Sequence, residues 1–536
     1  VQKYDVVVTN PPYMGGKGQN AKLSDFVRTN YPDSKSDLFA CLIEECCELL
    51  KPSGYQAMVT QHAWMFLSSY EKLRTKLLSQ HDIVNMAHFG ARAFEEIGGE
   101  VVQTAAFVLS ARKTIGYRGT YVRLVDFSSQ DEKEAAFLSG KHCYTASADN
   151  FAKIPGSPVA YWVSEAMLKV FRNGKSLVKI ADPKQGFATG DNNRFLRYWD
   201  EVSIQEMGFY MKDRTAAKSS GKTWFPCNKG GSFRKWYGNN AYVVNWRNDG
   251  IEMTSFGGSV IRNPGYYFRH GITWSTISSA ALSMRYSPVG TLFETKGSVC
   301  FLKNENYLYY LLGLLNSNTV FWLLKILSPT LDFHEGPIGR IPVIFDNAKK
   351  REIDTLVTSN ISLSRADWDS LETSWDFKRH PLICSASTIP EAYEQWKAKA
   401  NEMFDTLKAN EEELNRIFID IYGLQDELKP EEEDKDVTVH RIYNSKDDIP
   451  ESMAKSQYAL TKQDVVKSFI SYAVGCMFGR YSLDVEGLAY AGGEWDWGKY
   501  KRFLPDKDNI IPISDDEYFE DDIVGLFVKF VETVYG

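Results

Sequence analysis

The sequence predicts an α/β fold in its first part, a β-rich middle part and a helical last part. Residues 1–115 alternate apolar strand segments with amphipathic helices, which is the rhythm of a doubly wound sheet. From 116 to 345, short strands rich in aromatic residues, Gly and Asn replace that rhythm, with prolines between them. Residues 346–536 are helical and acidic. A chain of 536 residues is long enough for three such domains.

Each element of the first part has its own signal. Apolar runs of four to eight residues predict strands, and apolar residues at helical spacing predict helices. A Lys-Pro-Ser-Gly turn at 51–54 separates the first helix from the strand that follows it. The expected elements are strands at 4–9, 55–60, 82–89 and 101–111 and helices at 36–50 and 69–80.

The last part is expected to contain long helices near 389–423 and 462–479. The acidic run Glu431-Glu432-Glu433-Asp434 lies between them and indicates an exposed linker. The most apolar window, 308–327, is interrupted by Gly, Asn, Ser and Lys. We therefore expect a buried helix there and no membrane span.

Composition excludes several classes of protein. The amino-terminal residues lack a basic start, an apolar centre and a small-residue cleavage site, so a secretory signal is not supported. The eight cysteines form no CxxC pair and no zinc spacing. We expect reduced, mostly packed thiols, no metal site and a cytoplasmic location.

The tetrad Asn10-Pro11-Pro12-Tyr13 follows the first predicted strand directly. The exocyclic amino group of adenine is a poor nucleophile, because its lone pair is delocalised into the ring. Two acceptors aimed at its N–H groups would polarise it, and the Asn10 side-chain carbonyl and the Pro11 backbone carbonyl can serve. The rings of Pro11 and Pro12 fix the backbone there, and Tyr13 offers a face for an extruded base. The pattern indicates methylation of an amino group on DNA, although a plain Asn-Pro turn is the alternative.

In its surroundings the tetrad resembles motif IV of the gamma-class adenine-N6 DNA methyltransferases. The helix, the Leu-Leu-Lys-Pro-x-Gly turn and the strand that follow it are typical of these enzymes. Three later segments, 186–195, 414–424 and 475–482, resemble the methyltransferases of BREX phage-defence systems more narrowly. The resemblance therefore spans nearly the whole chain.

The resemblance implies a role for each part. Residues 1–115 would be the carboxyl-terminal half of a Rossmann-like methyltransferase sheet, ending in an antiparallel pair. Residues 116–345 would be the target-recognition domain that reads double-stranded DNA, and 346–536 a helical carboxyl-terminal domain. The implied activity is methylation of adenine N6 from S-adenosylmethionine after base flipping, which marks host DNA. Other BREX defence proteins would be partners, and the protein would bind DNA as a monomer.

The cofactor loop of such enzymes is not found in this sequence. They bind S-adenosylmethionine through a Gly-rich loop on an earlier strand, and this chain begins only a few residues before the tetrad. We expect it to be the carboxyl-terminal part of a longer protein, inactive alone. By resemblance, Asp37, Phe39 and Leu42 lie in the segment that contacts the cofactor. Phe94 would be a second aromatic beside the flipped base, with a core position as the alternative.

Basic charge is concentrated in one window of a chain whose net charge is −7. Residues 205–290 hold eleven Lys and Arg against four Asp and Glu, a net charge of +7, which leaves −14 elsewhere. We expect seven cations of this window, and one in the segment 186–195, to contact DNA phosphates or base edges. The alternative is that some of them are ordinary solvated surface cations. They are Arg194, Lys212, Arg214, Lys218, Lys222, Lys229, Arg234 and Lys235.

Two other functions fit parts of the pattern. A fused restriction-modification enzyme would carry a nuclease as well, which could lie in the missing upstream part. A non-catalytic DNA-specificity and assembly subunit of a defence complex would use the acidic helical part to dock its partners. The intact tetrad argues against this second alternative, because a binding module has no use for two acceptors beside a stacking ring.

Overall fold

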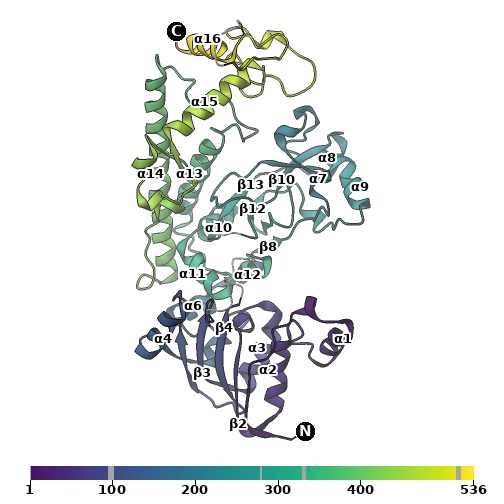
Figure 1. The fold of residues 1–536 in the computed structure, drawn as a ribbon, viewed down its shortest axis with the longest axis vertical. Helices are drawn as coiled ribbons and strands as arrows, with labels where there is room; N and C mark the ends of the chain where they lie inside the picture. The colour runs from purple at the N-terminus through teal and green to yellow at the C-terminus, as the bar shows by residue number, and fades with distance from the viewer. Residues whose placement is uncertain (1, 95–101, 278–280, 329–332, 515–518, 520) are drawn as a thin grey trace. The chain divides into compact units, whose positions relative to one another are not determined.

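The computed structural model describes residues 2–94, 102–277, 281–328, 333–514, 519 and 521–536, and it confirms the predicted α/β class. The chain divides into two compact units (Figure 1). Unit 1 comprises Val1–Leu177, Trp322–Thr330 and Gly336–Ile344. Unit 2 comprises Val178–Phe321, Leu331–Glu335 and Phe345–Gly536.

Unit 1 is built on a six-stranded sheet of order β1-β2-β4-β3-β5-β6. Strands β1, β2, β3 and β5 run parallel to one another, whereas β4 and β6 run antiparallel to their neighbours. The carboxyl ends of four strands therefore lie at one edge of the sheet, where ligands bind in open α/β sheets. The strands are β1 Tyr4–Thr9, β2 Leu50–Gln61, β3 Asp82–Gly90, β4 Thr104–Ser110, β5 Arg118–Arg123 and β6 Cys143–Ser147.

The first four strands and two helices lie where the sequence predicts them, and β3 and β4 form the expected antiparallel pair. The sheet also continues past residue 115, because β5 pairs with β3, His88 lying opposite Arg123. The expected domain boundary at 115 therefore falls inside this sheet. The helices of unit 1 are α1 Ala21–Asn30, α2 Leu38–Glu48, α3 Glu71–Gln80, α4 Gln130–Ser139, α5 Ala148–Phe151 and α6 Glu165–Asn173, and β7 Lys175–Ser176 pairs with β16 Pro342–Val343.

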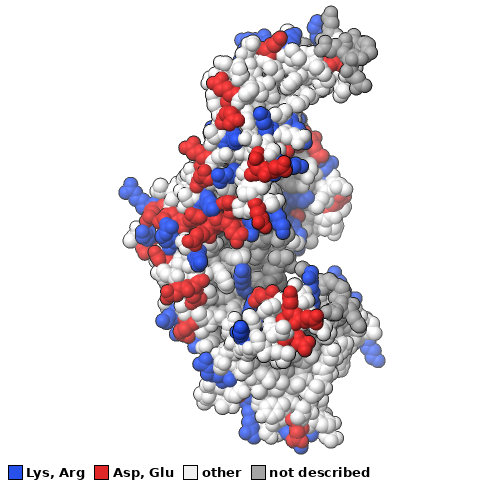
Figure 2. Space-filling view, turned by 60° about the vertical axis from the view of Figure 1, so that its left-hand side comes forward, with Lys and Arg blue, Asp and Glu red and all other residues white. Residues whose placement is uncertain are grey.

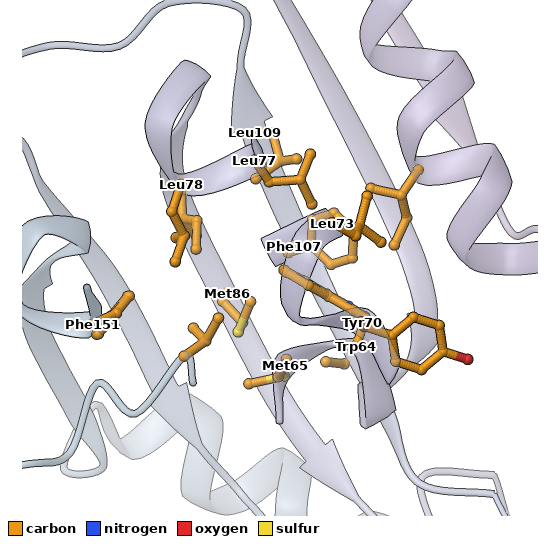
Figure 3. Close-up of a cluster of buried hydrophobic side chains, with 14 of the residues drawn as sticks. Trp64, Met65, Tyr70, Leu73, Leu77, Leu78, Met86, Phe107, Leu109 and Phe151 are labelled. Atoms are coloured by element: carbon orange, nitrogen blue, oxygen red, sulfur yellow. The ribbon is translucent and has the colours of Figure 1, made fainter. Parts of the chain in front are cut away.

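One face of the sheet packs against α2 and α3. Phe107 and Leu109 alternate along β4 with half-buried residues and lie in the same core as Leu73 and Leu77 of α3 (Figure 3). Strand side chains alternate between the two faces, so this core takes every second residue of β4. Removing these apolar side chains from water is the main stabilisation of the unit.

The first part of unit 2 consists of short strands, as the sequence predicts. They form two four-stranded sheets, of order β14-β10-β11-β9 and β13-β12-β15-β8. Phe187, Phe225 and Trp246 belong to their aromatic core. The strands are β8 Ala181–Lys184, β9 Leu196–Tyr198, β10 Trp224–Asn228, β11 Tyr242–Asn245, β12 Gly271–Trp274, β13 Met284–Ser287, β14 Leu292–Phe293 and β15 Val299–Leu302.

The last part of unit 2 is helical, and its longest helix begins and ends with ordinary capping chemistry. The Thr388 side chain accepts a hydrogen bond from the Glu391 backbone N–H, and Gly423 ends the helix with a φ of 66°. The expected helices at 389–423 and 462–479 are thus confirmed as α14 and α15. Its helices are α13 Lys350–Trp368, α14 Ile389–Tyr422, α15 Lys462–Met477 and α16 Ile523–Tyr535, and its strand pair is β17 Arg441–Tyr443 and β18 Ala459–Thr461. The earlier helices of unit 2 are α7 Asn192–Phe195, α8 Arg214–Ser219, α9 Arg247–Ser255 and α10 Leu308–Leu315. Most of α11 Asn318–Leu327 and of α12 Glu335–Gly339 belongs to unit 1.

The apolar window near 308–327 forms two helices at a bend. Within the described ranges, no single helix has the length and apolar character needed to cross a membrane. The segments Glu305–Leu315 and Asn318–Leu327, bent by 78°, satisfy that test only as a pair and only by length and composition. Leu311, Leu312 and Leu314 are fully buried, as expected for the core of a folded unit.

Candidate active site

Strand β1 places the tetrad at the carboxyl edge of the sheet. Val8 and Thr9 lie opposite Ala57 and Met58 of β2, so Asn10 follows directly at the strand end. Asn10 is exposed, whereas the next residue, Pro11, is buried. An exposed amide beside a fixed, buried backbone is suited to hold a planar group from outside.

The loop after the tetrad is tied to helix α2 through Asp37. The Met14 backbone N–H donates a hydrogen bond to Asp37 Oδ1 at 2.8 Å, and the Leu38 N–H donates to the Met14 carbonyl at 3.2 Å. The same Asp37 carboxylate caps α2 by accepting from the Phe39 N–H at 3.3 Å. The tetrad is therefore held by β1 on one side and by the cap of α2 on the other.

The Tyr13 ring is half-buried against the core. It meets Phe39 edge-on, with ring centroids 6.0 Å apart and an interplanar angle of 79°. Burial, and secondly the negative charge of Asp37, raise the pKa of the Tyr13 hydroxyl above its ordinary value of 10.0. Tyr13 therefore stays neutral at physiological pH, and its position is fixed by Phe39.

The three expected cofactor contacts, Asp37, Phe39 and Leu42, lie together at the start of α2. Phe39 is fully buried and also packs against Tyr70, with ring centroids 5.7 Å apart. Asp37 Oδ1 accepts hydrogen bonds from the backbone N–H groups of Met14 and Phe39, and Leu42 is half-buried in the same helix. Asp37 and Phe39 thus hold the segment that follows Asn10 in place, and their contact with the cofactor stays a prediction.

Phe94 comes four residues after the end of β3. It follows β3, which ends at Gly90, and its side chain is 44% exposed. The alternative of a core phenylalanine is therefore wrong, because a core ring would be shielded from water. Its role beside a flipped base stays a prediction.

The sheet face opposite α2 and α3 is open. A hollow of about 580 Å³ lies against it, lined by Asn10 and by half-buried residues such as Ala106 and Val108. Strand β1 is at the sheet's edge, and its Val8 is 71% exposed. An apolar strand edge left uncovered is unusual, because unpaired edges invite further pairing.

A group of histidines and aromatic residues at the same edge was not predicted. His62 follows β2, and His62 Nδ1 lies 2.8 Å from His88 Nε2, at the end of β3. His88 Nδ1 lies 3.1 Å from the Tyr161 hydroxyl. Burial lowers the pKa of His62 from 6.5 to about 4 and that of His88 well below 6.5. The sequence could have indicated His62 as a residue of this edge, because it follows a predicted strand. Nothing in the sequence indicates that it contacts His88.

Six of the eight expected DNA contacts lie at or near the surface of unit 2. Lys212 and Lys218 are exposed. Arg194 pairs with Glu252 at 2.8 Å between Nη2 and Oε1, and Arg214 forms a two-pronged pair with Asp249. Lys222 donates to the Gln205 carbonyl, and Lys229 lies 4.6 Å above the Tyr242 ring.

Arg234 and Lys235 correct the expected set. They are 2% and 3% exposed. Arg234 Nη2 lies 2.6 Å from Asp367 Oδ2, and Lys235 Nζ lies 2.7 Å from Glu411 Oε2. Both side chains form buried ion pairs inside unit 2 and are shielded from the surface. We therefore exclude both from the expected DNA contacts.

The acidic run at 431–434 also differs from its expected role. Glu432 accepts a second hydrogen bond from Lys235 Nζ at 2.6 Å, and its side chain is largely buried. The run is therefore partly a structural partner of the basic window rather than an exposed linker. Figure 2 shows acidic and basic side chains interspersed on one face of the molecule.

Comparisons with known proteins point in one direction. Residues 1–94 match the family described as Eco57I restriction-modification methylase. The whole chain is 46% identical to adenine-specific methyltransferase PglX of Lacticaseibacillus casei (strain Zhang). It is 38% identical to adenine-specific methyltransferase BrxX of Escherichia coli O9:H4 (strain HS). It spans 44% of the length of each of these relatives. The expected resemblance to the methyltransferases of BREX systems is confirmed.

A likeness to a solved structure is weaker. The restriction-modification enzyme MmeI in complex with DNA aligns with a TM-score of 0.49 and 11% identity, over 78% of this chain and 54% of that one.

Proposed function

We propose that this chain supplies the target-base side of a site-specific DNA adenine-N6 methyltransferase. The observation that carries the proposal is the exposed Asn10 at the end of β1, held beside the buried Pro11 by the bond between Met14 and Asp37. The relatives that cover the whole chain are named adenine-specific methyltransferases. The strand order β1-β2-β4-β3, with β4 antiparallel, supports the second half of a methyltransferase sheet.

The tetrad acts by holding and polarising the amino group of a flipped adenine. Asn10 Oδ1 and the Pro11 carbonyl oxygen each accept a hydrogen bond from one of its two N–H groups. These hydrogen bonds raise the electron density on N6. The ring of Tyr13 stacks on the base, and Phe94 closes its other side. Flipping costs a few kcal/mol, which stacking and these hydrogen bonds offset. S-adenosylmethionine is the methyl donor we propose, and the transfer is a direct displacement without a covalent enzyme intermediate.

The open face of unit 1 supports a division of labour within a longer enzyme. The exposed Val8 and the hollow beside Asn10 are covered, in this proposal, by the part of the protein that binds the methyl donor. Within this chain, Asp37, Phe39 and Leu42 at the start of α2 stay the proposed contacts to the methyl donor. Without the covering part, this chain alone would methylate poorly, and the longer protein would be the active species.

Unit 2 would choose the DNA sequence. Lys212 and Lys218 are exposed cations of the basic window, and Arg194 is exposed before it in the sequence. In the cell, the methylated adenines would mark host DNA for a BREX-type defence system, with its other proteins as partners.

The test is methyl transfer by the longer protein to double-stranded DNA from labelled S-adenosylmethionine. Asn10→Ala should abolish transfer and leave DNA binding nearly unchanged. Asn30→Ala is the matched control, because Asn30 is exposed and its side chain donates only to the Phe26 carbonyl within α1. Full activity in Asn10→Ala would overturn the proposal, and binding without transfer in the unaltered protein would favour the specificity-subunit alternative.

A further inference from the structure

Lys133 of helix α4 is a buried cation whose ammonium group is bound by backbone carbonyls. Lys133 is 3% exposed. Its Nζ donates three hydrogen bonds, to the carbonyls of Phe89 at 2.8 Å, Leu124 at 2.7 Å and Phe127 at 2.6 Å. An ammonium has three N–H donors, so all of them are used. Because three acceptors hold it, the Lys133 side chain is fixed in one position.

Two of these carbonyls belong to the ends of neighbouring strands. Phe89 is the last residue but one of β3, and Leu124 follows the last residue of β5. The two strands are parallel and paired, with His88 opposite Arg123. Lys133 therefore links the carboxyl ends of β3 and β5, at the edge of the sheet where β1 ends before Asn10.

The residues that follow Phe89 and Leu124 pack against each other. They are Gly90 and Val125, and a Cβ on Gly90 would lie only 2.9 Å from Val125 Cγ1. Gly90 also has a φ of 69°, in the left-handed region that glycine adopts most readily. The close contact therefore requires glycine at this position. The hydrogen bonds from Lys133 fix the residue immediately before each partner of the contact.

The segment that begins at Gly90 leads to the exposed ring of Phe94, four residues later. Arg92, between them, has a left-handed backbone with a φ of 55°. A residue with a side chain adopts this conformation at a cost in free energy, and it persists where the surrounding structure determines it. The path from Gly90 to Phe94 is therefore a defined one, and Lys133 fixes its start.

We propose that Lys133 is a positioning residue for the ring of Phe94. Its ammonium holds the carbonyls of Phe89 and Leu124, which keeps Gly90 against Val125 and directs the following segment toward the flipped adenine. Lys133 itself touches neither the base nor the methyl donor. The proposal rests on the proposed function, in which Phe94 closes one side of the base.

The test is a double-mutant cycle in the longer protein. Methylation of duplex DNA gives kcat and KM, and a duplex with 2-aminopurine in place of the target adenine reports by its fluorescence how the flipped base is stacked. Phe94→Ala should lower kcat/KM roughly tenfold, as expected for one lost stacking partner. Lys133→Met should lower it about threefold to tenfold, mainly through kcat, and should shift the fluorescence in the same direction as Phe94→Ala. The double variant should lose no more than Phe94→Ala alone.

Two control variants separate positioning from stability. Ser129→Ala removes the cap of α4 and leaves the three bonds of Lys133 in place, so it should keep the kcat and the fluorescence of the unaltered protein. Arg74→Met removes a buried cation of the same kind, and its loss of activity should multiply with that of Phe94→Ala. Arg74 is fully buried and donates to the carbonyls of Trp64, Leu67 and Gly156.

A second substitution reaches the same contact without removing a charge. Val125→Ala shortens the side chain that packs on Gly90, and it takes the place of Lys133→Met in the cycle if that variant does not fold. Losses that multiply in the double variant, or fluorescence unchanged by either substitution, would overturn the positioning role. Full activity in Phe94→Ala would overturn it too, because Lys133 would then have no ring to position. These results leave the proposed function standing, whereas full methylation by Asn10→Ala would overturn that function.

Discussion

The Asp37 carboxylate accepts a hydrogen bond of 2.8 Å from the backbone N–H of Met14, the residue that directly follows the tetrad. The same carboxylate begins helix α2 by capping the Phe39 N–H. One side chain thus links the start of a helix to the loop that presents Asn10 and Tyr13. The position of the proposed base-holding groups therefore depends on a residue that need not touch the base.

Asp37→Ala should reduce methylation more than it reduces stability. Loss of the helix cap costs about 1 kcal/mol of unfolding free energy, and loss of the Met14 bond frees the loop. Ser129→Ala is the control, because Ser129 caps α4 in the same unit by accepting from the Glu132 N–H. Thermal unfolding and methylation rates of the longer protein are compared. Similar activity in the two variants would show that the Asp37 link does not position the tetrad.

Lys235→Met should destabilise unit 2 strongly. Burial tends to lower the pKa of Lys235, but the carboxylates of Glu411 and Glu432 outweigh burial and raise it. Removing the cation leaves two acids buried together, a change that costs about 3–5 kcal/mol of unfolding free energy. Lys218→Met, at an exposed position, should change it by less than about 0.5 kcal/mol. Urea unfolding followed by tryptophan fluorescence measures both, and equal midpoints would contradict the buried role.

Lys212→Gln and Lys218→Gln should weaken DNA binding without affecting folding. Each lost phosphate contact releases one fewer counterion, so the slope of log affinity against log salt should fall by about 0.9 per substitution. Fluorescence anisotropy of labelled DNA at several salt concentrations measures the slope. An unchanged slope in both variants would mean that the DNA-binding surface of unit 2 lies elsewhere.

Acid should loosen unit 1 around β2 and β3. Burial lowers the pKa of His62 to about 4. His62 therefore takes up a proton below about pH 6.5 in the unfolded chain, but only near pH 4 in the folded unit. The contribution of neutral His62 to the free energy of unfolding is fully present above about pH 6.5 and is lost as the pH falls toward 4. The loss is at most about 3 kcal/mol for this one group. Hydrogen exchange of β2 and β3, corrected for its intrinsic pH dependence, measures the effect.

His62→Gln should make that pH dependence shallower, while His334→Gln, an exposed histidine of unit 2, should leave it unchanged. Exchange that is as steep in His62→Gln as in the unaltered protein would show that His62 does not carry this linkage.

Local patterns predicted the local structure well. The strand before the tetrad, the helix that begins after Asp37 and the long helix that ends at Gly423 were all evident, because caps, turns and periodicity are short-range signals. The class of the fold follows from the same signals.

Partners far apart in the chain were not predictable in this way. Arg234 and Asp367 are separated by 133 residues, and Lys235 and Glu411 by 176. The sequence shows the charge of a run of cations, but it does not show which distant acids pair with these cations in the folded protein. Phe39 likewise packs against Tyr13 and Tyr70, which lie outside its own helix.

The central claim is that Asn10 holds an adenine for methylation, and single-molecule sequencing of genomic DNA tests it most directly. Cells that carry the longer protein are compared with cells that carry its Asn10→Ala variant at the same protein level. We predict N6-methylated adenines at one DNA motif in the first and none at that motif in the second. Equal methylation in both, or unmodified DNA in both with the defence partners present, would contradict the account.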